Sequence, residues 1–465
     1  MLSILKLIGI TSLGTLTSRI LGFIRDLLSA SILGANVYSD IFFVAFKFPN
    51  LFRRIFAEGA FTQSFLPSFV KAKNKPAFAW LVFKKLFIII LILSLIVTLF
   101  SNLITDLLAP GFSEEVKKLA SPLVAINFWY LDLIFIVTFF SSLLQHKKQV
   151  FMSAFTPVLL NIAFIIALLI SKDLPKEQII WYLSLGVIFG GIAQVLAILY
   201  SAKKHNVLKL LCIGTKSKKQ EDLSTFKKHF LPSIFGNSTS QISSFIDTWL
   251  ATFLASGSIS YLWYANRLFQ LPFALFALAT SSVIFPEINK RLNKNQHKEA
   301  FEILKKMFWI LFYILTLATI VAIISSKEII TLLFEHGAFT KQDTLYTSVT
   351  LIMYMIGLIP AGLNKLLSSY LFATHRHLKA AKISAISLGV NIFFSLALIM
   401  PLKFYGLALA TSIGEIIKLF LIIKEFGFDK FIKFFEKKYI FYTILIILAS
   451  IILAVVFKNL ILLIT

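Results

Sequence analysis

The chain has 465 residues, of which 58% are hydrophobic and 15% charged, and its mean hydropathy is +0.85. A soluble globular protein could not cover its surface with so little charge, so the composition excludes that class and indicates a polytopic membrane protein. The apolar runs are nearly continuous over about 20 residues, the length of a membrane-spanning helix, which excludes the short alternating strands of a β-barrel. The predicted fold class is therefore all-α.

The net charge of +24 comes from lysines in short segments between the apolar runs. In a soluble chain such a charge would suggest nucleic acid. Positively charged cytoplasmic loops explain it without that partner, and a lysine-rich bias of the source genome is a further alternative. The single cysteine, Cys212, excludes an internal disulfide and a cysteine metal cluster.

The apolar runs and the residues that interrupt them predict thirteen spans. The first run has no small-residue cleavage site before it merges with a charged segment, so we expect it to be retained as a span. The predicted spans are residues 3–33, 38–70, 78–108, 119–145, 152–171, 178–200, 228–255, 260–289, 302–325, 344–373, 379–400, 404–424 and 438–464.

The basic residues alternate along the predicted loops. Loops after even-numbered spans are rich in Lys and Arg, whereas loops after odd-numbered spans contain few. Because positively charged loops stay in the cytoplasm, the N-terminus is predicted to be cytoplasmic and the C-terminus to lie outside.

The longest polar stretch, about Ala202 to Lys228, divides the predicted spans. We expect an N-terminal lobe of six spans at 1–201 and a basic cytoplasmic linker at 202–228. A C-terminal lobe of six spans follows at 229–425, and one extra span at 426–465. The basic linker is predicted to lie along the inner leaflet, near anionic lipid.

The segment from Ser18 to Pro67 is unusually charged for a bilayer segment. Its charged residues are Arg19, Arg25, Asp26, Asp40, Lys47, Arg53, Arg54 and Glu58. A charge at mid-membrane costs at least about 2.5–3.5 kcal/mol, so these residues are expected to face a polar cavity. Arginine dominates, and it holds oxyanions in bidentate geometry, which predicts a phosphate-bearing or carboxylate-bearing cargo. The alternative is a set of snorkelling or interfacial charges.

A weak internal repeat places similar features in both halves. Asp26 and Asp247 each precede a tight turn, and each turn is followed by a span with an internal proline, Pro49 or Pro272. Proline breaks a helix, and such breaks at membrane depth are tolerated inside protein or along an aqueous cavity. The second and eighth spans are therefore predicted to bend around the site, within two parallel repeats. Chance similarity between apolar hairpins is the alternative.

In the second half, Arg267 lies five residues before Pro272 and is expected to face the cargo, with an interfacial anchor as the alternative. Asp247 has two open interpretations: a cation or proton site, or a counter-charge for a cavity arginine such as Arg267. Asp132 is a similar but weaker candidate.

Two further predictions concern the last spans of the second half. Lys365 is a candidate to line the tenth span. Glu415 and Lys418, three residues apart on one helix, are expected to pair with each other.

Soluble catalytic machinery is missing from the sequence. It contains neither a G-x-x-x-x-G-K-[ST] phosphate loop nor an H-E-x-x-H motif. A transport protein therefore fits better than an enzyme, with neither a catalytic residue nor a metal site. Its energy would come from an ion gradient or from the membrane potential.

Three segments resemble the signature segments of MurJ/MviN-type proteins, the bacterial lipid II flippases. They are SRILGFIRD at 18–26, SDIFFVAFKFPNLFRRIFAEGAFTQSFLP at 39–67 and YLWYANRLFQLP at 261–272. The order of matching segments is consistent along the whole chain. The resemblance implies an exporter-type fold of two six-helix lobes around a central cationic cavity, plus about one extra C-terminal helix. The cargo would be undecaprenyl-diphosphate-linked disaccharide pentapeptide, turned to the outer face of the cytoplasmic membrane.

The resemblance also implies functional residues. The family's arginines fall on Arg19, Arg25, Arg53 and Arg267, and its important aspartates fall on Asp26 and Asp40. Membrane lipids, and in addition cell-wall synthesis proteins, are implied as partners, and nucleic acid is not.

Two departures from the family pattern stand out. Family members usually have two C-terminal helices beyond twelve spans, which form a groove for the lipid tail, and this chain has one. Some members bind sodium, and Asp247 fits that site, but Tyr370 and Thr374 occupy its other positions. The alternatives for coupling are therefore Na⁺, H⁺ or the membrane potential alone.

The resulting hypothesis is alternating access. The diphosphate and sugar are held by Arg25, Arg53 and Arg267 while the polyprenyl tail stays in lipid. Alternatives are a drug or cation antiporter of the same broad fold, another lipid-linked oligosaccharide exporter, and a scaffold that gathers cell-wall enzymes without transport.

Overall fold

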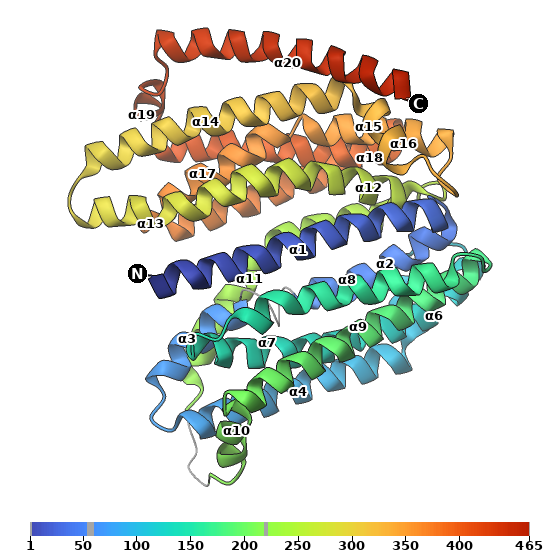
Figure 1. The fold of residues 1–465 in the computed structure, drawn as a ribbon, viewed down its shortest axis with the longest axis vertical. Coiled ribbons are helices and arrows are strands. Elements are labelled where there is room, and N and C mark those ends of the chain that lie inside the picture. Colours follow the sequence, from blue (N-terminus) through green and yellow to red (C-terminus); the bar gives the residue numbers. More distant parts are fainter. Residues whose placement is uncertain (1, 54–59, 218–221, 465) are drawn as a thin grey trace. The chain divides into compact units, whose positions relative to one another are not determined.

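The computed structural model describes residues 2–53, 60–217 and 222–464, and it divides into two compact units, Met1–Ser256 and Gly257–Thr465. Each unit is built from helices (Figure 1). Two residues of the charged hairpin, Arg54 and Glu58, lie outside the described residues.

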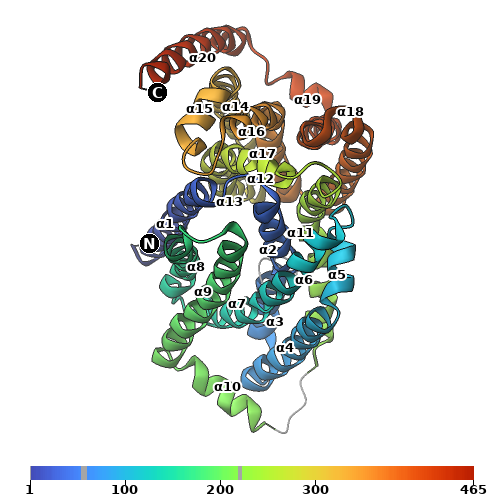
Figure 2. The same ribbon diagram turned by 90° about the vertical axis from the view of Figure 1, so that its right-hand side faces the viewer.

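The first unit contains eleven helices within its described residues. Helix α8 packs between α1 and α9 (Figure 2). The helices are α1 (Leu2–Leu33), α2 (Val37–Phe52), α3 (Ala60–Lys71), α4 (Lys75–Leu99), α5 (Ser101–Leu108), α6 (Glu114–Phe128), α7 (Tyr130–His146), α8 (Phe151–Ser171), α9 (Lys176–Lys204), α10 (Val207–Thr215) and α11 (Ser224–Ala251).

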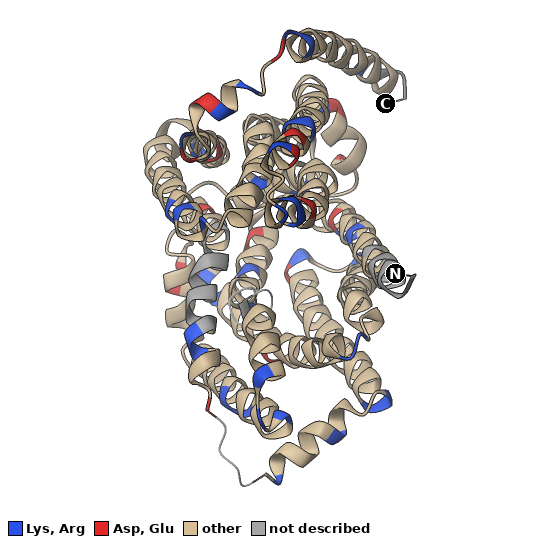
Figure 3. Ribbon diagram, turned by 90° about the vertical axis from the view of Figure 1, so that its left-hand side faces the viewer, with Lys and Arg blue, Asp and Glu red and all other residues tan. Residues whose placement is uncertain are grey.

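The second unit begins with a helix that continues into a π-helix. Its elements are α12 (Ser258–Pro272), the π-helix η2 (Phe273–Leu278), α13 (Ala279–Asn293), α14 (His297–Ile324), α15 (Ser326–Phe334), α16 (Lys341–Met355), α17 (Leu358–Ala373), α18 (His377–Phe426), α19 (Phe428–Ile432) and α20 (Lys437–Ile464). Most of the ribbon is tan in Figure 3, and charged residues occur in short patches, as expected for bilayer segments.

The predicted spans coincide with these helices or with consecutive helix pairs. Helix α18 covers two predicted spans, because it consists of two helical segments that meet at a kink at Lys403, where the backbone φ of 52° and ψ of −136° are not helical. By length and composition, nine stretches of the described chain could cross a membrane. This number is below thirteen in part because α18 counts once and short helices such as α2 are not counted. The all-α, multi-pass prediction is confirmed.

A capped turn joins α1 to α2. Gly34 has a φ of 77°, a conformation that glycine adopts without steric strain. The Asn36 side chain then accepts hydrogen bonds from the backbone N–H groups of Tyr38, at 2.9 Å, and Ser39, at 3.4 Å. This N-cap begins α2 and places Asp40 in its first turn, where the helix dipole favours a negative charge.

The predicted break in the eighth span is present. Helix α12 ends at Pro272, and a π-helical turn follows directly. Proline lacks the N–H that would continue the helical ladder, so the chain re-forms its hydrogen bonds with a wider turn. In the second span, α2 ends at Phe52, three residues after Pro49.

Helix α11 belongs to the first unit by its packing. It contacts α2 and α3, and Trp249 donates a hydrogen bond from Nε1 to the Leu107 carbonyl at 2.9 Å. The Gly111 N–H donates to Oγ1 of Thr252 at 3.2 Å. The division into two units reflects which helices touch, and α11 touches helices of the first unit. It does not test the lobe boundary predicted at 202–228, which stays a prediction.

The predicted basic linker contains the end of α9 and the short helix α10. Val207, Leu211 and Gly214 of α10 are buried, and the helix packs on α4. Lys209 and Lys216 are exposed. This segment is therefore amphipathic.

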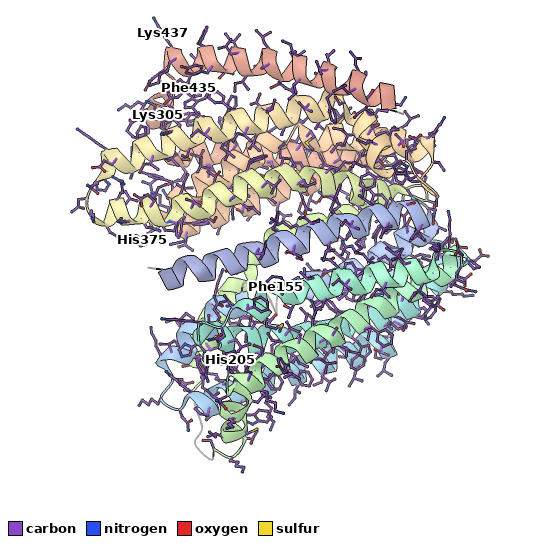
Figure 4. The ribbon with its side chains drawn as sticks, viewed as in Figure 1. Phe155, His205, Lys305, His375, Phe435 and Lys437 are labelled. Atoms are coloured by element: carbon purple, nitrogen blue, oxygen red, sulfur yellow. The ribbon has the colours of Figure 1, made fainter. Side chains whose placement is uncertain are left out.

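The extra C-terminal span, α20, is attached to α14 near its start. Lys305 forms an ion pair with Glu436, and Trp309 donates from Nε1 to the Phe434 carbonyl at 2.8 Å. Lys305 and Phe435 are labelled at this end of the helix in Figure 4. Much of the rest of α20 exposes large apolar side chains, as expected for a lipid-facing helix.

Candidate functional site

Arg25 is a buried cation with its hydrogen-bonding groups occupied. It lies on α1 and is 7% exposed. Its Nη2 and Nε donate to Oδ1 of Asp26 at 2.8 and 3.2 Å, and its Nη1 donates to Oδ1 of Asn161 at 3.1 Å. The guanidinium carbon lies 5.1 Å from the centre of the Phe164 ring. This combination of ion pair, amide and aromatic face stabilises a charge that burial would otherwise disfavour.

Asn161 connects this arginine to a second point on α1. Its Nδ2 donates to the Ser18 carbonyl at 2.9 Å and to Ser18 Oγ at 3.3 Å. Sequence reasoning missed Asn161. The available signal was an amide in the otherwise apolar run of α8, since a buried amide requires hydrogen-bonding partners.

The two acidic residues of the predicted site are both buried, each 3% exposed. Asp26 is the ion-pair partner of Arg25. Asp40 lies at the start of α2.

The other two arginines of the first unit differ in exposure. Arg19 is exposed, whereas Arg53 is half-buried directly after α2. Neither residue belongs to the hydrogen bonds found around Arg25.

Lys47 joins α2 to α11 inside the first unit. Its Nζ donates to the Ser244 carbonyl at 2.6 Å and also to Thr248 Oγ1. Asp247, the residue before Thr248, is 6% exposed. The sequence indicated a cation near Pro49, and in the structure this cation, Lys47 of α2, contacts the helix that carries Asp247, α11.

In the second unit, Arg267 lies on α12 above an aromatic ring of the same helix. Its guanidinium carbon is 4.7 Å from the centre of the Trp263 ring, one turn earlier. The side chain is half-buried, five residues before Pro272 and the π-helix η2. The predicted grouping of Arg267 with Arg25 and Arg53 joins residues of both units and stays a prediction.

Asp132 is 5% exposed, and Oγ of Ser94 donates a hydrogen bond to its Oδ2. Its Oδ1 has no hydrogen-bond partner among the described residues. No ion pair found in the described part of the chain includes Asp132, so the structure gives no support for a counter-charge role.

The predicted pair of Glu415 with Lys418 is wrong. Instead, Nδ2 of Asn364 donates to Glu415 Oε2 at 2.7 Å and to the Glu415 carbonyl at 2.8 Å. The partner comes from another helix, α17, because the packing of α17 on α18 brings an amide closer to the carboxylate than the lysine on the same helix.

No group of three or more His, Cys, Asp or Glu residues that could hold a metal ion occurs in residues 2–53, 60–217 and 222–464. At the positions that differ from the sodium-binding pattern, the Thr374 hydroxyl donates to the Tyr370 carbonyl at 3.0 Å. That hydroxyl therefore satisfies a backbone carbonyl at the C-terminal end of its own helix, α17.

Comparison with protein families gives one match that covers most of the chain. The family described as "Lipid II flippase MurJ" matches residues 29–464. A protein of Helicobacter pylori (strain ATCC 700392 / 26695), named "Probable lipid II flippase MurJ", is 50% identical over 417 residues, which are 87% of this chain and 90% of the relative.

Solved structures show the same fold. "Lipid II flippase MurJ, inward closed conformation" matches with a TM-score of 0.78 and 28% identity, over 97% of this chain and 98% of that one. A multidrug resistance MATE family transporter in an inward-facing conformation matches with a TM-score of 0.66 and 15% identity, over 89% of this chain and 94% of that one. At that identity the second likeness shows the fold alone.

Proposed function

The chain belongs to the lipid II flippase MurJ family, and from this premise we propose how it moves lipid II across a bacterial cytoplasmic membrane. It is a multi-pass membrane transporter and not an enzyme, and its cargo is lipid II. The antiporter alternative is not favoured, because the similarity to multidrug transporters extends to the fold only.

We propose that the N-terminus is cytoplasmic and that the cargo moves from the inner to the outer face. The alternation of basic and neutral loops supports this orientation. Lipid II is used for peptidoglycan outside the cytoplasmic membrane, so this direction is the productive one.

The observation that carries the proposal is the buried arginine of α1. Arg25 on α1 is 7% exposed and paired with Asp26 at 2.8 Å. A diphosphate offers stronger and more numerous acceptor oxygens than one carboxylate. We propose that the cargo diphosphate replaces Asp26 as the acceptor at Nε and Nη2 of Arg25, while the hydrogen bond from Nη1 to Asn161 is retained.

This exchange supplies a difference between the empty and loaded states. A ligand changes a conformational equilibrium only through its differential affinity for the two states. In the proposal, Asp26 is released when cargo binds and closes on Arg25 again when cargo leaves. Arg19, Arg53 and Arg267 contribute further positive charge, and Asp40 is a second acidic residue of the site.

We propose alternating access as the mechanism. The π-helical turn after Pro272 and the end of α2 close to Pro49 are the positions at which the backbone departs from regular α-helix in these spans. Bends at such positions change helix direction with little cost elsewhere. The polyprenyl tail stays in lipid throughout.

The energy source is proposed to be the membrane potential, an H⁺ gradient or a Na⁺ gradient. One charge that crosses 100 mV is worth about 2.3 kcal/mol, enough to bias a transport cycle. Asp247 is buried in α11 and is the candidate for a coupling cation or a counter-charge. Membrane lipids and cell-wall synthesis proteins are proposed partners.

The test is transport of lipid II by the purified chain in sealed vesicles, measured by access of the lipid to an impermeant reagent outside. Arg25→Ala is expected to abolish transport. Arg25→Lys is expected to reduce it strongly, because lysine lacks the planar group with which arginine binds Asn161 and an acidic partner, either Asp26 or the diphosphate, at the same time. Lys172→Ala, at an exposed lysine, is the matched control.

The proposal fails if Arg25→Ala folds, inserts and moves lipid II at the wild-type rate. A second arm in the native cell depletes the protein and measures which face of the membrane holds the precursor. Precursor that still reaches the outer face, in a strain without another flippase, would contradict the proposed direction.

A further inference from the structure

Two lysines lie within spanning helices of the second unit, at matching depth. Lys365 is on α17 and Lys418 is on the second half of α18. Each is about two turns, or about 12 Å along the axis, from the last residue of its helix. Neither residue has a role in the function proposed above.

The packing of the two helices brings these lysines to one level. Asn364, directly before Lys365, bonds to Glu415, which lies one turn before Lys418. The hydrogen bonds of Asn364 therefore place Lys365 and Lys418 at the same level of two packed helices.

The backbone at Lys365 is fixed by a third helix. Its carbonyl accepts hydrogen bonds from Ser369 Oγ at 3.0 Å and from Ser281 Oγ at 3.3 Å. The two hydroxyls lie 2.6 Å apart and join α17 to α13. These hydrogen bonds fix the point of the backbone from which the Lys365 side chain projects.

The charges at this position do not cancel. Glu415 is the carboxylate of the group, and its Oε2 is held by Asn364. Within the part of the chain that the structure describes, none of the ion pairs includes Lys365 or Lys418. Lys365 is exposed and Lys418 is half-exposed, so both can be reached. A net positive charge in a spanning helix is costly and marks a site for an anion.

We propose that Lys365 and Lys418 form a second anion site, which takes a carboxylate of the peptide on the cargo. This inference rests on the proposed function, in which the arginines hold the diphosphate. The remaining anionic groups of a lipid-linked disaccharide pentapeptide are the carboxylates of its peptide. Two flexible ammonium groups match a mobile peptide end better than they match a rigid diphosphate, because each lysine is a compact point charge without a planar fork.

The first test compares two cargoes in sealed vesicles of neutral lipid. One cargo is lipid II, and the other is the same lipid-linked disaccharide without its peptide. Lys365→Gln and Lys418→Gln are expected to raise the apparent KM for lipid II about tenfold, the loss of one charge-assisted hydrogen bond. The KM for the peptide-free cargo is expected to change less than about twofold. Lys382→Gln, at an exposed lysine on α18, is the matched control.

The variants also separate charge from structure. Lys365→Arg keeps the positive charge and is expected to retain the wild-type KM for lipid II. An equal loss with both cargoes, or no loss with either, overturns the inference. A rise in KM that appears only in vesicles of anionic lipid, and is equal for both cargoes, also overturns the inference. It would show that the lysines bind a lipid headgroup phosphate instead.

A second test does not depend on transport. Soluble N-acetylmuramyl pentapeptide, which lacks lipid and diphosphate, is titrated into the purified full chain. Its affinity is expected to fall about tenfold in Lys365→Gln and Lys418→Gln and to stay unchanged in the control Lys382→Gln. Lysine-dependent binding without lipid II transport by the wild type would refute the proposed function and keep the anion site. An affinity for the soluble pentapeptide that is the same in the wild type and in both lysine variants would refute the site.

Discussion

Oδ1 of Asn161 on α8 accepts a hydrogen bond from Nη1 of Arg25 on α1 at 3.1 Å. The same side chain donates to Ser18, so one amide holds α1 at two points nearly two turns apart. Arg25 is thus oriented by a neutral residue as well as by Asp26. A neutral partner can remain in place when the cargo replaces the acidic one.

Replacement of Asn161 by alanine is expected to weaken both the fold and transport. The buried Arg25 loses one partner, and a hydrogen bond to a charged group contributes about 1.5–3 kcal/mol to stability. The measurements are the melting temperature in detergent and the rate of lipid II transport. Ile162→Ala, at the 39% exposed neighbouring residue, is the control. Wild-type values for Asn161→Ala would show that Arg25 does not need the amide.

Gly111→Ala is expected to destabilise the first unit. A Cβ at this position would lie 2.4 Å from the Phe253 backbone nitrogen, at the end of α11, so the backbone has to move. Overpacking of this kind costs about 1–3 kcal/mol. Gly389→Ala is the matched control, because nothing lies within 4 Å of a Cβ there. Equal melting temperatures for the two variants would contradict the close contact.

Lys403→Gly is expected to stabilise the protein by about 1 kcal/mol. Lys403 has a φ of 52° and a ψ of −136°, a conformation that only glycine adopts without strain. Lys403→Ala removes the charge but keeps the strained backbone, so its melting temperature should match the wild type. A gain in both variants would assign the effect to the charge of the lysine.

The docking of α20 is expected to weaken at acid pH. Hydrogen bonds from Lys305 and then from Lys438 lower the pKa of Glu436 below its ordinary value of 4.5. A carboxyl whose pKa is lower in the folded state contributes stability above its unfolded pKa, and this contribution is lost as the pH falls through the folded pKa. The melting temperature measured from pH 6 downwards should therefore fall more in the wild type than in Glu436→Gln.

Asp173→Asn, which removes an exposed carboxylate in the first unit, is the control for this comparison. Its pH profile should follow the wild type. Parallel profiles for the wild type and Glu436→Gln would show that the ion pair with Lys305 does not hold α20.

Asp132→Asn is expected to fold as well as the wild type. Asp132 is 5% exposed, and its Oδ1 has no partner among the described residues, so a neutral side chain suits this position better than a carboxylate. Asparagine keeps the size and still accepts the hydrogen bond from Ser94. Asp132→Leu loses this acceptor and should lower the melting temperature. A large loss in Asp132→Asn would indicate that the negative charge itself is required.

The sequence by itself determined the all-α class, the positions of the spans, the break after Pro272 and the charged hairpin. These features are local. A bilayer requires about 20 apolar residues per helix, proline removes a backbone donor wherever it stands, and an arginine in an apolar run is visible without its partners.

Only the tertiary structure decided which side chains meet. It joined Arg25 to Asn161, Lys47 to the helix of Asp247, and Glu415 to Asn364 instead of Lys418. The partners in these pairs lie far apart in sequence, and each contact depends on which faces of two helices pack together. Hydropathy cannot specify those faces, because a spanning helix is apolar all round and its polar positions find partners only when the helices are assembled.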